Sequence, residues 1–346
     1  VKNIPAHGFE VMSKLNTVSL PSTLERIGDY AFWACIRLEN IKAENMENTV
    51  LGDHSFSSCK QLSNININGV KNIPPFCFED CKKLKSVITG DNCTEISKSA
   101  FFGCDSLRKI KMSENLISIG DSAFFNCQVL DSVIFPSKLK TIGVATFENC
   151  YSLSSVILKE NVESIGFRAF EFCEGLVNLD LENTKLDTIN TLAFDGCKVL
   201  KEVKLPKNLK FIGFGGFRNC STLDKIEVPQ NTKYLSEQCF FQCENLKTVV
   251  LPDSLETIGV DCFNSCKSIE EFTIPVGIKR LGTNFLSVTP SLKRLYMLSP
   301  ELFNDVRHYD ISEIIPQRVT LYVKKGNKKK VKDTYWKHFT MIEEVK

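Results

Sequence analysis

The sequence lacks the features that mark membrane-spanning, nucleic-acid-binding and metal-dependent proteins. None of its apolar runs is long enough to cross a bilayer. The net charge is +2, which predicts no general attraction to nucleic acid or to an anionic membrane. The four histidines lie far apart, at His7, His54, His308 and His338. None is spaced from a cysteine or carboxylate as a metal ligand would be, and no glycine-rich phosphate loop is present. We therefore expect no catalytic residue, no metal, no cofactor and no enzymatic activity.

The start of the chain lacks an initiator methionine and a signal peptide. Val1 already lies inside a repeat, and no separate N-terminal cap precedes it, although a repeat array needs its ends covered. We therefore expect a processed or truncated product, with any anchor in a missing N-terminal segment.

What is present is a ladder of eleven cysteines that recur every 22 to 24 residues. A phenylalanine lies three residues before each of them, and a leucine or isoleucine lies three residues after. A fixed period in this range is typical of a solenoid, in which each repeat buries its apolar face only against its neighbours. The ladder consists of Cys35, Cys59, Cys81, Cys104, Cys127, Cys150, Cys173, Cys197, Cys220, Cys243 and Cys266.

The coil at residues 116–135 illustrates the repeat. Its first inward-facing residues are Ile119, Ala123, Cys127 and Leu130. Spacings of four, four and three predict that these side chains share one face of a short helix. Leu130, Val133 and Phe135 then follow the pattern of a short strand, which Pro136 ends because it cannot donate a ladder hydrogen bond. We therefore predict an α/β solenoid with a parallel sheet on one face and short helices on the other.

The repeat pattern divides the chain into two parts. Thirteen coils are counted when Phe9 and Phe285 are included, and the pattern stops after Met297. Residues 298–316 read as irregular, and residues 319–323 read as a last strand. We therefore predict a leucine-rich solenoid over residues 1–298 and a C-terminal capping segment over residues 299–346.

The capping segment contains a lysine cluster followed by aromatic residues. The lysines are Lys324, Lys325, Lys328, Lys329, Lys330 and Lys332, and the apolar residues after them include Val331, Tyr335, Trp336, Phe339 and Ile342. Their spacing suggests an amphipathic helix whose aromatic face covers the end of the solenoid. Binding of nucleic acid or an anionic surface is the alternative role for the lysines. We favour the solvated face of a cap.

The total of fifteen cysteines is odd, and eleven of them occupy one equivalent position. This placement predicts small buried hydrophobic side chains with free thiols rather than a disulfide framework. Neighbouring coils lie close enough for an occasional bond, such as Cys239 to Cys262. Three Cys-x-x-x-Cys pairs would need a further converging ligand to bind zinc, and both positions are already explained as core.

The repeat Leu-x-x-Ile-Gly-x-x-Ala-Phe-x-x-Cys-x-x-Leu-x-x-Val-x-Leu-Pro resembles the leucine-rich repeat of the BspA-like family. Residues 139–158 carry most of it, and the resemblance extends over residues 1 to about 298. The resemblance implies a secreted or cell-surface protein that takes part in adhesion to host proteins or other cells. It implies no shared catalytic residues.

The candidate binding surface lies on the outward side chains of the predicted strands. In the middle of the chain these residues are uncharged and include exposed aliphatic side chains: Ser132, Ile134, Ser155, Ile157, Val177 and Asn178. Charged residues flank them at Arg108, Lys109, Lys111, Asp131 and Asp180. Exposed apolar surface flanked by charge is typical of a contact site, although β-branched residues also suit strands for their own sake. We therefore predict a protein or glycan partner at this patch. A structural spacer that projects another module is the alternative function.

The outward positions of the C-terminal half differ, because their charges alternate in sign. One row runs Lys201, Asp224, Lys247, Glu270 and Lys293. Further pairs are predicted across neighbouring strands at Glu202/Lys225, Lys204/Glu227 and Glu271/Arg294. We therefore expect this half to neutralise its own surface.

Overall fold

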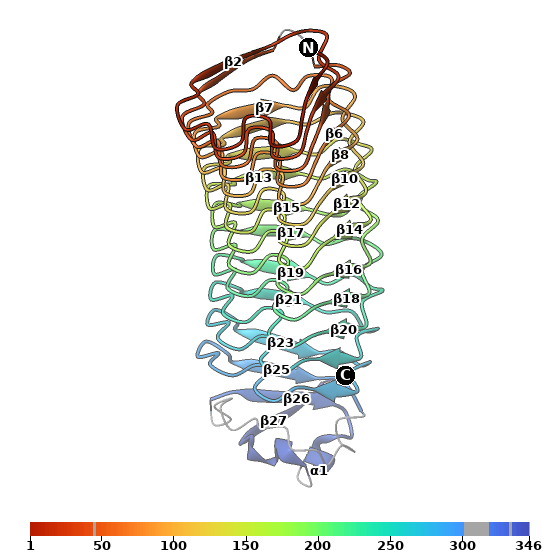
Figure 1. The fold of residues 1–346 in the computed structure, drawn as a ribbon. Coiled ribbons are helices and arrows are strands. Elements are labelled where there is room, and N and C mark those ends of the chain that lie inside the picture. The colour runs from red at the N-terminus through yellow and green to blue at the C-terminus, as the bar shows by residue number, and fades with distance from the viewer. Residues whose placement is uncertain (44–45, 301–317, 332–333, 346) are drawn as a thin grey trace. The chain divides into compact units, whose positions relative to one another are not determined.

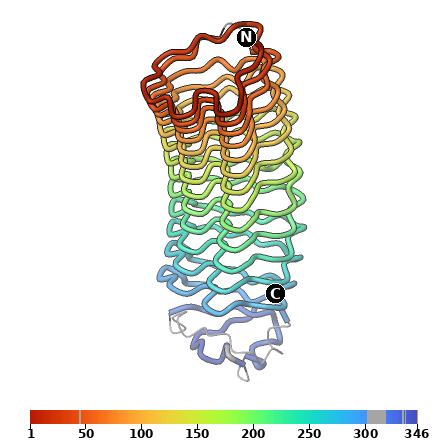
Figure 2. Tube along the Cα trace, in the orientation of Figure 1, coloured from red at the N-terminus to blue at the C-terminus, as the bar shows by residue number. Residues whose placement is uncertain are grey.

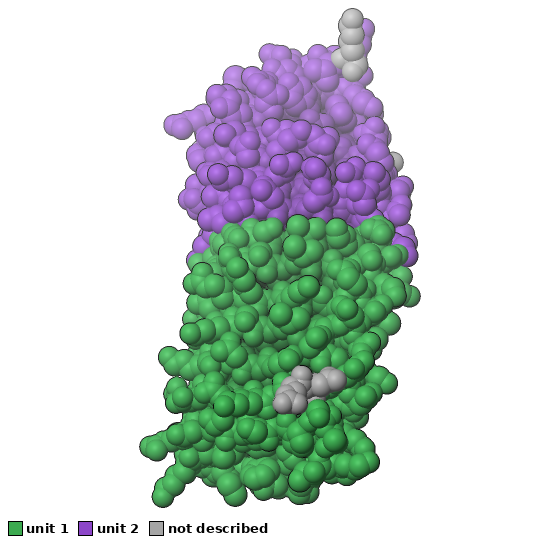
Figure 3. Space-filling model, turned by 90° about the horizontal axis from the view of Figure 1, so that it is seen from above, with its two compact units in different colours: residues 1–176 green, residues 177–346 purple. Residues whose placement is uncertain are grey.

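The computed structural model describes residues 1–43, 46–300, 318–331 and 334–345, and it is a parallel-sheet β-solenoid of about 14 turns. The chain forms two compact units, residues 1–176 and 177–346 (Figure 3). Both are built from the same coil, which the trace in Figure 2 repeats turn after turn. The sequence predicts thirteen coils, and the sheet extends beyond the last of them, through two strands that follow Met297.

The first unit stacks its strands in parallel columns (Figure 1). Two-residue strands β6, β8, β10, β12 and β14 form one column, and three-residue strands β7, β9, β11 and β13 form the other. Near the N-terminus β3 pairs with β1 on one side and with β5 on the other, and β2 pairs with β4. The bounds are β1 Asn3–Ile4, β2 Thr17–Leu20, β3 Arg26–Ile27, β4 Asn40–Ala43, β5 Val50–Leu51, β6 Asn72–Ile73, β7 Ser86–Ile88, β8 Glu95–Ile96, β9 Lys109–Lys111, β10 Ser118–Ile119, β11 Ser132–Ile134, β12 Thr141–Ile142, β13 Ser155–Ile157 and β14 Ser164–Ile165.

The second unit repeats this arrangement and adds a terminal segment. Strands β16, β18, β20, β22 and β24 form one column, β15 pairs with β17, and β19 pairs with β21. Strands β23, β25, β26 and β27 form a parallel sheet. The bounds are β15 Asn178–Asp180, β16 Thr188–Ile189, β17 Glu202–Lys204, β18 Phe211–Ile212, β19 Lys225–Glu227, β20 Tyr234–Leu235, β21 Thr248–Val250, β22 Thr257–Ile258, β23 Glu271–Ile274, β24 Arg280–Leu281, β25 Arg294–Met297, β26 Thr320–Lys324, the helix α1 Lys328–Val331, the 3-10 helix η2 Tyr335–His338 and β27 Met341–Val345.

The core of each unit is a column of phenylalanine rings. In the first unit the ring of Phe124 lies 5.2 Å from Phe101 and 5.1 Å from Phe147, and the rings are nearly parallel. In the second unit Phe217 and Phe240 lie 5.7 Å apart in the same way. The rings repeat at about the spacing of paired strands, so each coil places its phenylalanine directly on that of the coil before it. The predicted inward register is therefore confirmed.

The cysteines form a second column beside the rings. All fifteen are buried and free, which confirms the prediction of packed thiols over a disulfide framework. The Cys127 thiol donates a hydrogen bond of 3.3 Å to the backbone carbonyl of Phe101, one coil earlier. Cys150 donates to Phe124 in the same way. Cysteine thus fills a small apolar space, and its thiol adds a second hydrogen bond to a carbonyl oxygen that already accepts one from a backbone amide, as Phe101 does from Cys104.

The face predicted to be helical consists of turns instead, and this part of the prediction was wrong. Ser122 and Asn126 adopt left-handed backbone conformations, with φ of 53° and 60°, which a right-handed helix does not contain. The amides of Ser122 and Asn126 donate to the next coil, to the carbonyls of Val144 and Glu148. The Phe124 amide between them also donates to the next coil, to Thr146, whereas the amides of Ala123 and Phe125 close local turns. Alternate amides therefore stitch coil to coil, and too few remain for a helical ladder.

The glycine that follows many of the short strands, such as Gly143 after β12, is explained by close approach of neighbouring backbones. A Cβ atom on Gly143 would lie 2.6 Å from the amide nitrogen of Asp121 and 2.7 Å from the carbonyl carbon of Gly120. Gly143 is absent from the residues with positive φ, so a special backbone angle is not the reason. Successive coils pack so tightly at this corner that they leave no space for a side chain.

The terminal segment differs from the predicted amphipathic helix. The described residues after β26 form the one-turn helix α1 and the 3-10 helix η2, followed by β27. Val331, Trp336 and Phe339 are buried, and the predicted last strand is confirmed as β26. Residues 301–317 and Lys332 lie outside the described residues. The division into a solenoid ending at 298 and a cap beginning at 299 therefore stays a prediction.

Candidate recognition surface on the strand face

Three of the four strands in the three-residue column of the first unit have the same sequence, Ser-Val-Ile. They are β7, β11 and β13, and in each the valine points inward while the serine and isoleucine point outward. Ile88, Ile134 and Ile157 are 55%, 64% and 44% exposed. The coil therefore leaves aliphatic side chains in water on every strand of this kind, which is unusual for isoleucine.

Strand β9 interrupts this series with the sequence Lys-Ile-Lys. Lys109 pairs with Ser86 on one side and Ser132 on the other, and Lys111 pairs with Ile88. The same parallel register places Lys111 beside Ile134. One row across the sheet is therefore Ile88, Lys111, Ile134 and Ile157, at about 4.8 Å per strand.

The residues directly before β7 and β9 add two further cations, Lys85 and Arg108. They are adjacent, because the Arg108 amide donates to the Lys85 carbonyl across the strands. In the described part of the chain, none of Lys85, Arg108, Lys109 and Lys111 makes an ion pair, and Asp131 interrupts the row after Arg108. We call these exposed residues the basic–aliphatic patch: Lys85, Ile88, Arg108, Lys109, Lys111, Ile134 and Ile157.

The edge of the basic–aliphatic patch is hollowed. A depression of about 400 Å³ is bordered by Lys85, Arg108 and Lys109, and its other walls are Ser86, Asp105, Ser106 and Val129. One oxygen of the Asp105 carboxylate binds Lys82 at 3.1 Å, and the other is buried without a hydrogen-bond partner. The depression therefore combines one acid in its wall with three cations at its rim that form no ion pair among the described residues.

The structure brings some of the predicted site residues together. Ser132 pairs with Ser155, and Ile134 pairs with Ile157, on adjacent strands. Val177 and Asn178 belong to the second unit, where Val177 is half-buried and Asn178 is exposed and pairs with Glu202. The sequence interpretation named Arg108, Lys109 and Lys111 as flanking charges but overlooked Lys85, which occupies the Arg108 position one coil earlier.

The strand face of the second unit is neutralised by ion pairs, as the alternating charges predict. Lys247 binds Asp224 at 2.9 Å, Lys293 binds Glu270 at 2.9 Å, and Arg294 binds Glu271. Two predicted partners were wrong. Lys225 binds Glu227, which lies two residues away on its own strand, and Lys204 binds Asp180 at 3.2 Å, the residue with which it pairs on the neighbouring strand.

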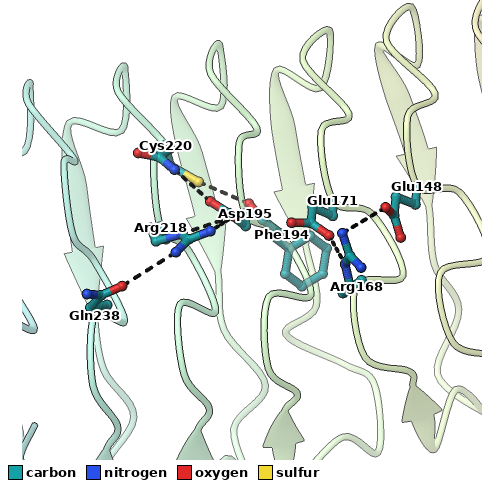
Figure 4. Close-up of polar contacts among 9 residues, drawn as sticks. Glu148, Arg168, Glu171, Phe194, Asp195, Arg218, Cys220 and Gln238 are labelled. Atoms are coloured by element: carbon teal, nitrogen blue, oxygen red, sulfur yellow. Dashed lines mark hydrogen bonds and ion pairs between the residues drawn. The ribbon is translucent and has the colours of Figure 1, made fainter.

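The turn face carries buried acids that the sequence interpretation missed. In the first unit Arg168 binds both Glu171 and, at 3.0 Å, Glu148 (Figure 4). Burial raises the pKa of the Glu148 carboxyl above its ordinary value, while the Arg168 guanidinium opposes this shift. The sequence signal that could have revealed these buried acids is an acidic residue directly after the core phenylalanine in successive coils. Arg168 therefore supplies the positive charge that both buried acids need.

The second unit has a counterpart of this cluster. Asp195 is fully buried, and it accepts hydrogen bonds from Arg218 at 2.6 Å and from Asn219 at 2.9 Å (Figure 4). Arg218 also donates to Gln238. Every oxygen of the Asp195 carboxylate is therefore engaged, which is how a buried charge is tolerated.

Burial keeps these thiols protonated. Burial raises the pKa of the Cys93 thiol to about 11 and that of Cys77 to about 12, so both stay protonated at neutral pH. The Cys262 pKa is raised by burial and by its contact with Cys239, and both thiols are free. Across the described ranges, no group of three His, Cys, Asp or Glu side chains is arranged to hold a metal ion.

Comparison with known sequences identifies the family of the repeat. The profile of the BspA-type leucine-rich repeat region matches residues 1–107, 71–198 and 176–293. The chain belongs to the BspA-type leucine-rich repeat family. No curated protein sequence matches it. Among the described residues, no helix has the length and apolar character needed to cross a membrane.

Solved structures share this leucine-rich-repeat fold. A leucine-rich repeat protein from Bacteroides ovatus is 21% identical, with a TM-score of 0.67, over 94% of this chain and 88% of its own. A leucine-rich cell surface protein from Faecalibacterium prausnitzii is 19% identical, with a TM-score of 0.49, over 100% of this chain and 87% of its own. The pneumococcal vaccine antigen PcpA is 19% identical, with a TM-score of 0.48, over 100% and 85%. At 21% identity, the likeness to the Bacteroides ovatus protein establishes the fold alone.

Proposed function

We propose that the protein is a non-enzymatic recognition module that binds a protein or glycan partner on the strand face of its first unit. The observation that supports this most is the row of exposed isoleucines at Ile88, Ile134 and Ile157. An aliphatic side chain loses contact with water only when a partner covers it, and that burial favours association. Repeat folds commonly present such extended surfaces to their partners.

We also propose that the protein acts outside the cell, in adhesion to host proteins or to other cells. This proposal rests on the resemblance of its repeats to a family whose members are typically exported. The experiment below therefore uses intact cells as the binding target.

The direct test is a pair of neutral substitutions, Ile134→Ser and Ile157→Ser, which remove aliphatic surface and add no charge. We expect binding of the labelled protein to epithelial or bacterial cells, measured by flow cytometry, to weaken at least about tenfold. Val250→Ser is the matched control, because Val250 is 46% exposed at the same strand position in the second unit. Treating the cells with protease or with glycosidases distinguishes a protein partner from a glycan. A folded double variant that binds like the wild type would rule out this surface.

A structural spacer is the second candidate function, and the second unit favours it. Its strand face neutralises its own charges through pairs such as Lys247–Asp224 and Lys293–Glu270, so it offers a partner little unsatisfied charge. In that case the wild type, the Ile134→Ser/Ile157→Ser double variant and the Val250→Ser control would show no binding to any cell surface.

A further inference from the structure

The basic–aliphatic patch carries information about the chemistry of the partner. Its cations are exposed and, within the described residues, have no ion-pair partner, in contrast to the paired cations on the strand face of the second unit. Lys85 and Arg108 are adjacent on neighbouring strands, where like charges are destabilising. A strand face that served only to space modules gains nothing from this arrangement.

We infer that the basic–aliphatic patch binds an acidic protein segment that also carries aliphatic side chains. This inference rests on the proposed function and specifies its partner. Carboxylates of such a segment would lie over Lys85, Arg108 and Lys109 at the hollowed edge. Its aliphatic side chains would cover Ile134, on the strand next to β9, and Ile157, one strand further along.

The aliphatic row decides between a protein segment and a sulfated glycan. Both would satisfy the four cations. A sulfated glycan exposes hydroxyl and sulfate groups along its length, and it would leave Ile88, Ile134 and Ile157 without an apolar partner. A protein segment can match charge and apolar surface together. Charge complementarity would also speed its association, in a manner that salt weakens.

The repeat itself supplies variants that should fold. The coil of β13 carries Ser154 and Ser155 at the positions that Arg108 and Lys109 occupy in the coil of β9. Arg108→Ser/Lys109→Ser therefore copies a neighbouring coil and leaves the isoleucines in place. Lys225→Ser/Lys247→Ser removes the same charge from equivalent positions of the second unit and is the matched control. Lys85→Ser is a second patch variant, which keeps the inference testable if the double variant does not fold.

The experiment uses fluorescence polarisation of a labelled peptide of alternating Glu and Leu with the full chain. We expect the wild type and the Lys225→Ser/Lys247→Ser control to bind it equally at low salt. Arg108→Ser/Lys109→Ser should bind about tenfold more weakly, and added salt should weaken the wild type toward this variant. Peptides with Glu replaced by Gln, or Leu replaced by Ser, should each bind more weakly than the parent peptide.

Three results would overturn the inference. One is equal peptide binding by the patch variants and the wild type. Another is undiminished binding of the Leu-to-Ser peptide, which would mean that the isoleucines take no part. The third is binding of heparin, and not of the peptide, in a manner that depends on Arg108 and Lys109. If peptide binding fails while Ile134→Ser/Ile157→Ser still weakens cell binding, the proposed function stands and only the acidic partner is wrong.

Discussion

The two units share one core and differ in their strand faces. Phe124 and Phe147 lie 5.1 Å apart in the first unit, and Phe194 and Phe217 lie 5.3 Å apart in the second. On the strand face, however, the first unit exposes isoleucines beside cations that form no ion pair among the described residues, whereas the second unit pairs Lys204, Lys225, Lys247, Lys293 and Arg294 with acids. The fold requires only the inward residues, so the outward rows are free to serve different purposes.

This difference separates what the coil needs from what a partner needs. Ion pairs on an exposed sheet contribute little to stability, yet the second unit forms them repeatedly, because uncompensated like charges would repel. The first unit accepts such repulsion at Lys85 and Arg108. Lys210 and Lys233 are adjacent in the same way in the second unit, but each binds an acid, so the proposed recognition role of the first unit rests on the repulsion at Lys85 and Arg108 that no ion pair among the described residues offsets.

The largest expected effect tests whether the two cores are equivalent. Phe124→Ala and Phe240→Ala each remove a fully buried ring from a stacked column, and each should lower the free energy of unfolding by about 3–5 kcal/mol. Urea unfolding followed by circular dichroism measures both. Phe125→Ala is the control, because Phe125 is only half-buried and should cost less. A much smaller loss of unfolding free energy in one unit than in the other would show that the two cores are not equivalent.

A smaller effect contrasts a buried acid of the first unit with an exposed acid of the second. Burial raises the Glu148 pKa above 4.5, so the folded state binds this proton more readily than the unfolded state does. The wild type should therefore gain stability relative to Glu148→Gln as pH falls through the range just above 4.5. The hydrogen bond from Lys293 lowers the Glu270 pKa, so the wild type should lose stability relative to Glu270→Gln as pH falls below 4.5.

The urea midpoint of each variant, measured against pH beside the wild type, checks these opposite slopes. Both substitutions replace a carboxylate by a neutral amide of the same shape, so packing is matched. Parallel slopes for the two variants would show that Glu148 is not held in a more strongly desolvated site than Glu270.

The smallest effect compares a paired with an unpaired lysine. Lys247→Ser removes the 2.9 Å ion pair with Asp224 and should cost about 0.5 kcal/mol or less. Lys109→Ser breaks no ion pair and should leave stability unchanged or raise it slightly, because it relieves repulsion within the basic–aliphatic patch. High salt should remove the difference between the two variants. Equal destabilisation at low salt would mean that Lys109 has an intramolecular role.

Much of the fold could be predicted from the repeat period. The positions of Phe124, Cys127 and Leu130 recur in every coil, and a residue that recurs at one position must occupy one environment. This reasoning located the core, the inward strand residues and the free thiols. The same register also predicted ion pairs between alternating outward charges, such as Lys247–Asp224.

The turns escaped prediction because their cause lies in neighbouring coils. The spacing of Ile119, Ala123 and Cys127 suits a helix within one coil. In the structure, alternate amides such as that of Ser122 donate to the next coil, and these contacts determine the conformation. The glycine at Gly143 is likewise explained by the backbone of another coil, at Asp121. The terminal segment was misjudged in the same way, because β27 takes its partner from β26 instead of continuing a helix.

The candidate site was predicted in part. Ile134 and Ile157 follow from the strand register, whereas the grouping of Lys85 with Arg108 required the paired strands, and the division into two units removed Val177 and Asn178 from it.

By itself, the sequence determined that this protein is a leucine-rich solenoid with a dry core of phenylalanine and cysteine, because a strict period constrains every inward position at once. The tertiary structure decided how each coil closes and which outward charges find a partner. Hydrogen bonds between coils and distances between outward side chains depend on contacts with residues about one period away, which local spacing does not encode.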